Sequence, residues 1–212
     1  TTIIEAGELH ISGNAVKLGT GALTVKNGAI LSGTTGSGAL SNSIYNINAG
    51  AILQVGNIAT STTGKLDFGG KNLTVAKDAI IELGISSAKN YTMLQNINKL
   101  TMNGTIRLQW STWTPAEGDS IQLFQNVSTF AGTPVMESTV VDAEKGLYWD
   151  TSNLASKGFL RVTATPNGIG EINAHLSNVY VVEGKVYVPG ANNICIHTLD
   201  GVYINPDSRL SK

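Results

Sequence analysis

The chain has 212 residues, a net charge of −1 and only 14% charged residues, which excludes the basic surface that nucleic-acid or anionic-membrane binding needs. No apolar run approaches the roughly 18 residues of a membrane-spanning helix. The single cysteine, Cys195, excludes an internal disulfide, and its place in an alternating apolar run predicts a small buried residue.

The first half of the chain repeats one pattern five times. Two apolar residues at alternate positions precede a small or polar turn, and a second apolar strand follows, as in Leu73–Gly84. A unit of this size cannot bury its own apolar face, so a period in the twenties predicts stacked units. Two short strands per unit favour an all-β fold, a short parallel β-helix (β-solenoid). The turn markers, spaced 21, 22, 28 and 26 residues apart, are Gly7, Gly28, Gly50, Asp78 and Gly104.

Strand alternation predicts which side chains face the core. In the first strand of each unit we expect two inward columns, with the residue between them facing out. The inward pairs are Leu23 and Val25, Tyr45 and Ile47, Leu73 and Val75, and Leu100 and Met102.

The second strand is ambiguous. Counted from the turn, one register suits the outer units and the other suits the middle ones, so either a bulge shifts the middle units or both strand faces are covered. The two sets are Leu9, Ile11, Ile106 and Leu108, against Leu53, Val55, Ile81 and Leu83.

After Trp110 the pattern changes, and we divide the chain into a repeat region (1–110), a β-rich cap (111–165) and a C-terminal β segment (166–212). Trp110 and Trp113 suit a cover for the open end of an apolar stack. Alternatively, these two rings together with Tyr148 and Trp149 form a surface on which sugar rings stack.

Three motifs follow in order: Gly118-Asp-Ser-Ile-Gln-Leu-Phe124, Gly146-Leu-Tyr-Trp-Asp-Thr-Ser-Asn-Leu154 and Gly158-Phe-Leu-Arg-Val162. Their order resembles the end of autotransporter-associated β-strand repeat proteins, and the resemblance covers roughly residues 20–165. It implies a secreted, right-handed parallel β-helix closed by a β-rich cap. That family is a scaffold without a shared catalytic site, so no active residues are carried over.

The last segment contains a hairpin signal, Val179–Val188, with Glu183-Gly184 at the bend. Together with Leu199–Gly201 it resembles the type IX secretion sorting module of Bacteroidetes, a small β-sandwich. The family's final strand is missing here, which leaves an incomplete, truncated module. We expect an unpaired edge there that accepts a strand from elsewhere.

No catalytic or metal-binding constellation is recognisable. The histidines are scattered, with His10 and His197 at outward strand positions and His175 in a linker, and no zinc spacing occurs. Cleavage of polysaccharides by a β-helix needs carboxylates stacked on successive units, and the best set, Asp67, Asp78 and Glu82, does not stack. The sequence therefore predicts no enzyme, no cofactor and no metal.

Two hypotheses result. The first is a non-catalytic exported module, secreted or on the bacterial outer surface, that acts as a structural spacer or an adhesive. The second is a carbohydrate-binding or carbohydrate-cleaving β-helix. Either one predicts a cell-surface glycan or another surface protein as partner, with no nucleic acid and no membrane insertion. The oligomeric state stays open.

Overall fold

The computed structural model describes residues 1–13, 18–36, 38–56, 64–110 and 112–164, and the backbone of 180–182, 185–187, 196–197 and 203–204. The chain forms two compact units, Thr1–Gly168 and Ile169–Lys212. More than half of the described residues lie in strands, and the one helix among them is short, α1 (Leu154–Lys157). The fold is therefore all-β.

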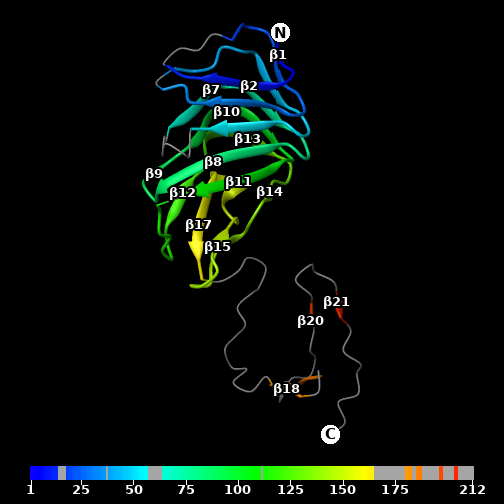
Figure 1. Ribbon diagram of the computed structural model, residues 1–212, viewed down its shortest axis with the longest axis vertical. Helices are drawn as coiled ribbons and strands as arrows, with labels where there is room; N and C mark the ends of the chain where they lie inside the picture. The colour runs from blue at the N-terminus through cyan, green and yellow to red at the C-terminus, as the bar shows by residue number, and fades with distance from the viewer. Residues whose placement is uncertain are drawn as a thin grey trace. The chain divides into compact units, whose positions relative to one another are not determined.

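Two parallel sheets make up most of the first unit (Figure 1). Along most of this unit, strands that follow one another in the chain belong alternately to the first sheet and to the second. The first parallel sheet has the order β1 (Thr2–Ile4), β3 (Leu23–Val25), β5 (Ile44–Ile47), β7 (Lys65–Val75), β10 (Met93–Met102) and β13 (Phe124–Ala131). The second has the order β2 (Gly7–Ile11), β4 (Ala29–Gly33), β6 (Ile52–Val55), β8 (Ile80–Ser87), β11 (Thr105–Trp110) and β14 (Val135–Met136), and β9 (Asn90–Tyr91) pairs antiparallel with β8.

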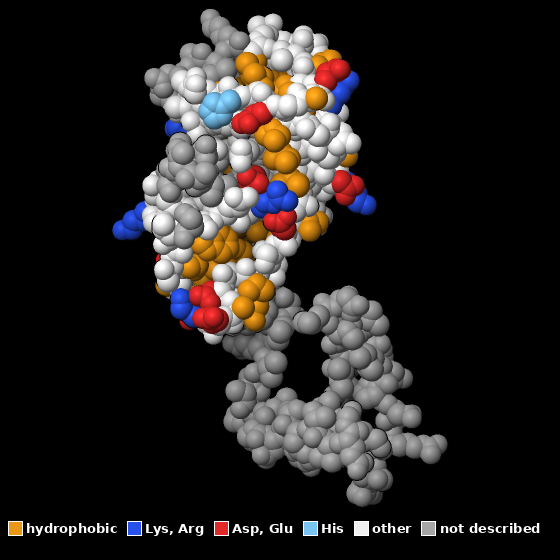
Figure 2. All heavy atoms as spheres, viewed as in Figure 1, with side chains coloured by type: hydrophobic (Ala, Val, Ile, Leu, Met, Phe, Trp, Pro, Cys, Tyr) orange, Lys and Arg blue, Asp and Glu red, His pale blue; other side chains and the backbone are white. Residues whose placement is uncertain are grey.

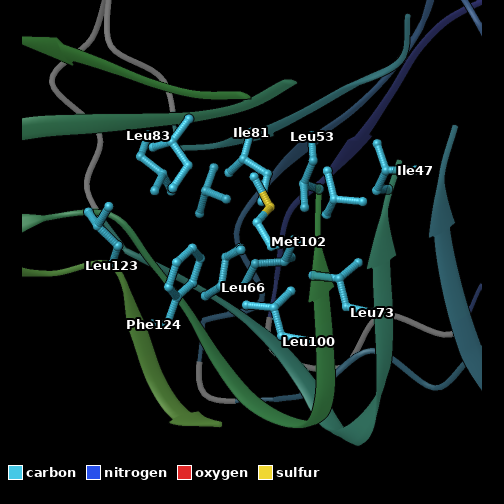
Figure 3. Close-up of a cluster of buried hydrophobic side chains, with 14 of the residues drawn as sticks. Ile47, Leu53, Leu66, Leu73, Ile81, Leu83, Leu100, Met102, Leu123 and Phe124 are labelled. Atoms are coloured by element: carbon cyan, nitrogen blue, oxygen red, sulfur yellow. The ribbon is translucent and has the colours of Figure 1, made fainter. Parts of the chain in front are cut away.

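The core lies between the two parallel sheets, and the predicted inward columns of the first sheet are confirmed. Leu23, Tyr45, Leu73 and Leu100 pair in register from strand to strand, and so do Val25, Ile47, Val75 and Met102. All eight side chains are at most 1% exposed. Figure 3 shows side chains of both sheets, among them Leu73 and Leu100 from one and Leu53 and Ile81 from the other, pointing toward one another.

The second strands share one register, so a bulge in the middle units is wrong, whereas the outward residues Ser32 and Glu82 are buried, as the alternative of two covered faces expects. Leu9, Leu31, Leu53, Ile81 and Ile106 form a single column without a register shift. The turns differ in length instead, because Gly7 pairs with Ala29 rather than with Gly28, and Gly104 lies level with Ala79. The marker glycines are therefore not equivalent positions.

The middle turns share one backbone geometry. Gly28, Gly50 and Asp78 have φ values of 76°, 72° and 66°, the left-handed region that favours glycine. Backbone bonds join these turns, from the Gly28 N–H to the Gly50 carbonyl at 3.0 Å and from the Gly50 N–H to the Asp78 carbonyl at 2.9 Å. Asp78 therefore continues a glycine column, since aspartate tolerates this conformation better than most residues.

Both parallel sheets continue past residue 110 through β13 and β14. This region also contains a separate four-stranded antiparallel sheet, with the order β12 (Ser120–Gln122), β17 (Phe159–Thr163), β16 (Leu147–Asp150) and β15 (Val140–Asp142). The three motifs of the closing region contribute β12, β16, α1 and β17. The three-part domain division made from the sequence stays a prediction.

The second unit contains two short antiparallel pairs. β18 (Tyr180–Val182) pairs with β19 (Lys185–Tyr187), which confirms the predicted hairpin around Glu183-Gly184. β20 (Ile196–His197) pairs with β21 (Tyr203–Ile204). Cys195 and His175 lie outside the described residues, as does the side chain of His197.

Candidate functional site

The three carboxylates considered for polysaccharide cleavage lie apart in the fold. Asp67 belongs to β7 in the first parallel sheet and Glu82 to β8 in the second, while Asp78 is exposed in the turn between β7 and β8. In the described part of the chain, no three His, Cys, Asp or Glu residues come together to hold a metal ion. The sequence expectation that these acids do not stack agrees with this placement.

Glu82 belongs to a polar row on the outer face of the second parallel sheet. It accepts a hydrogen bond from Gln54 Nε2 and one of 3.2 Å from Arg107 Nη1. Arg107 also donates from Nε to both oxygens of Glu137 at 2.9 Å. This bond lowers the pKa of Glu137 and raises that of Arg107. On the face in Figure 2, acidic and basic side chains occur in such small mixed groups among uncharged ones.

The same face holds a serine between a histidine and a glutamate. Ser32 Oγ donates to Glu8 Oε1 and lies 2.8 Å from His10 Nδ1, so its only proton is used and Nδ1 acts as the donor. Ser32 is 1% exposed, whereas His10 faces outward as predicted. A hydroxyl that is 1% exposed is closed to a substrate, so the contact with Glu8 does not make Ser32 a nucleophile. We interpret the trio as a structural polar contact.

Of the four aromatic residues singled out in the sequence, the three tryptophans form one cluster, while no ring contact among the described residues joins Tyr148 to it. Trp113 and Trp149 stack with ring centroids 5.8 Å apart, and Trp110 meets both rings edge-on at 5.8 and 6.2 Å. Trp113 is 9% exposed and Trp149 is 1% exposed, while Trp110 and Tyr148 are partly exposed. The proposed sugar stacking stays a prediction, and only Trp110 and Tyr148 present ring surface for it.

A shallow hollow of about 450 Å³, open to solvent, lies where β7, β10 and β13 run side by side, and several of its lining residues are polar. Asp67 Oδ1 accepts from the Gly69 N–H at 2.8 Å, and Oδ2 accepts from Gln95 Nε2 at 2.5 Å and Asn96 Nδ2 at 2.6 Å. Asn126 Nδ2 donates to Asn96 Oδ1 at 3.0 Å. The hollow is lined by Ala39, Asp67, Gly69, Gly70, Asn96, Ile97, Asn98, Asn126 and Ser128.

None of the site residues predicted from the sequence points to this hollow as a binding site. A signal was present, because Gln95-Asn-Ile-Asn98 and Gln125-Asn-Val-Ser128 repeat one tetrad 30 residues apart. The pairing of Gln95 with Gln125 and of Ile97 with Val127 places the two tetrads side by side. Their asparagines at the second position share a corner of the sheet.

Comparisons with protein-family models, with curated proteins and with solved structures give no match. A search of the described residues for a helix that could cross a bilayer finds none. The established class is an all-β chain with two parallel sheets.

Proposed function

We propose that the chain is a non-catalytic module of a secreted or bacterial cell-surface protein, serving as a structural spacer or an adhesive surface. We also propose that its first unit is a right-handed parallel β-helix. The main support is the pair of parallel sheets built from alternating strands, with inward columns in register through Leu73 and Val75. Such a stack provides length and a repeating outer surface.

Export is proposed from the resemblance of the closing motifs to autotransporter-associated repeats and of the tail to a type IX sorting module. The sparse charge of the chain is compatible with that proposal. The three acids that a β-helix hydrolase would need stand in different sheets and in a turn. Carbohydrate binding is therefore a better second candidate than carbohydrate cleavage, and the partly exposed Trp110 and Tyr148 favour it.

Two measurements test the proposal together. Beads coated with the chain should adhere under flow to surfaces carrying glycans or matrix proteins better than albumin-coated beads do. The soluble chain should release no reducing sugar from a panel of neutral and acidic polysaccharides. Release that is lost in Asp67→Asn or Glu82→Gln would overturn the non-catalytic assignment. Adhesion no stronger than that of albumin-coated beads would contradict the adhesive role.

A spacer has its own requirement, which is resistance to unfolding along the stack. Limited proteolysis of the whole chain should leave a resistant fragment that ends near Gly168, the boundary between the two compact units. Rapid cleavage inside the sheets, between Leu23 and Met102, would contradict a spacer function.

A further inference from the structure

We propose that the hollow lined by Asp67, Asn96, Asn98, Asn126 and Ser128 binds a neutral, hydroxyl-rich glycan. The inference rests on the proposed adhesive function and names its ligand class and its surface. The hollow lies outside the aromatic cluster for which the sequence predicted sugar stacking.

Backbone strain is concentrated at this place. Only three non-glycine residues in the described part of the chain have positive φ values, and two of them, Asn96 at 55° and Asn126 at 54°, line the hollow side by side. The third, Asp78, belongs to the glycine column of the turns. Residues held in sparsely populated backbone regions are frequently found at binding sites. Here the strain projects two amides from adjacent strands toward the same space.

The chemistry of the lining favours uncharged hydroxyl groups. The only charged residue in the lining is Asp67, which is 7% exposed, and its donors described above are a backbone N–H and two side-chain amides. An amide has two N–H groups and an oxygen with two lone pairs, so Asn96, Asn98 and Asn126 can donate to and accept from sugar hydroxyls in addition to their bonds within the protein. An anionic ligand would face the Asp67 charge without a basic residue in the lining.

The spacing of the strands supports a linear ligand. Asn96 pairs with Asn126, and Asn98 lies level with Ser128, so equivalent polar groups recur on neighbouring strands about 4.8 Å apart. Asn98 Nδ2 also donates to Asn72 Oδ1 at 3.0 Å, which fixes its amide at the edge of the hollow. A glycan laid across β10 and β13 would meet the same pattern of polar groups more than once.

A calcium site is the main competing interpretation. Calcium normally takes six to eight oxygen ligands, often from several carboxylates. The lining supplies one carboxylate, and both of its oxygens already accept hydrogen bonds from the protein. The geometry therefore points to the glycan, and calcium becomes an outcome of the test.

Calorimetry of the whole chain with cellohexaose, laminarihexaose and maltohexaose tests the proposal. We expect at least one of them to bind, and the double variant Asn96→Gly/Asn126→Gly to lose at least about tenfold in affinity. Glycine removes both amides and retains the left-handed backbone. The matched control is Asn46→Ala, an outward asparagine on β5 outside the hollow, which should bind as the parent does.

Binding of none of the three neutral hexaoses would overturn the inference, as would equal binding by the double variant. Binding confined to polygalacturonate or to calcium chloride would also overturn it. If glycan binding is instead lost in Trp110→Ala or Tyr148→Ala, the hollow is not the binding site, and the glycan binds at these exposed aromatic residues. Bead adhesion that survives the double variant would refute the hollow and leave the adhesive function standing.

Discussion

Replacing Leu73 by alanine should destabilise the first unit strongly, because this side chain stands in the middle of an inward column. It is 0% exposed and pairs in register with Tyr45 on one side and Leu100 on the other. Removing three carbon atoms loses about 2.4 kcal/mol of transfer free energy at roughly 0.8 kcal/mol for each. The neighbouring strands are fixed by backbone ladders on both sides, so the cavity cannot collapse fully.

With the cavity included, we expect a total loss of about 3–4 kcal/mol for Leu73→Ala. Urea unfolding followed by tryptophan fluorescence measures it, since Trp110, Trp113 and Trp149 report from the far end of the stack. The matched control is Thr74→Ala, the adjacent residue that faces outward, which should change stability by less than about 0.5 kcal/mol. A loss below about 1 kcal/mol for Leu73→Ala would refute the column as the source of stability.

Three smaller predictions use the turns, a buried hydroxyl and a surface ion pair. Gly28→Ala and Gly50→Ala should each cost about 1 kcal/mol from positive φ, because the atoms nearest a Cβ at Gly50 belong to the exposed Asn27 side chain, which can rotate away; comparing their urea midpoints checks this. Tyr45→Phe should change thermal stability little, because this buried hydroxyl has at most a poorly aligned contact with the Asn42 backbone. Burial raises the pKa of Tyr45 to about 12, so an ultraviolet titration should show one tyrosine ionising late. Glu137→Gln should cost less than about 1 kcal/mol at neutral pH; because Arg107 lowers the pKa of Glu137, that difference should disappear as pH falls through the folded-state pKa, as urea unfolding at several pH values would show.

Most of the first parallel sheet could be predicted from the sequence because strand alternation is a local property. Leu23, Tyr45, Leu73 and Leu100 each begin an apolar pair with a polar residue between, and that pattern alone assigns the inward face. The pairing partners followed from the repeat. No knowledge of distant contacts was needed.

The register of the second sheet could not be predicted because glycine occurs in these turns for two different reasons. Some positions need a positive φ, and another has no room for a Cβ atom. Gly28 and Gly50 are needed for positive φ. Gly104 is not in that region, and a Cβ there would lie 2.5 Å from the Ala79 carbonyl oxygen. Aligning the turns on glycine therefore compared unlike positions and produced an apparent shift of one residue.

The sequence did not distinguish an aromatic ring buried in the core from one exposed on a binding surface. Large size places Trp113 and Trp149 equally well in a core and on a binding surface, and both are buried in the structure. The asparagine tetrads carried better information about the outer surface. Asn96 and Asn126 also have a structural role, because Asn96 donates to the buried Asp67 carboxylate and Asn126 donates to Asn96.

The hollow itself arises from unequal strand lengths at that corner. Between the paired positions Asp67–Gln95 and Lys71–Ile97, β7 contains three residues and β10 contains only Asn96. Two of the three in β7 are Gly69 and Gly70, which contribute backbone and no side chain. The extra length opens space that the glycines do not fill, while the inward columns stay in register. A side chain at Gly70 should therefore narrow the hollow without a steric clash, as its Cβ would meet no atom within 4 Å, but it should cost about 1 kcal/mol because φ there is +73°.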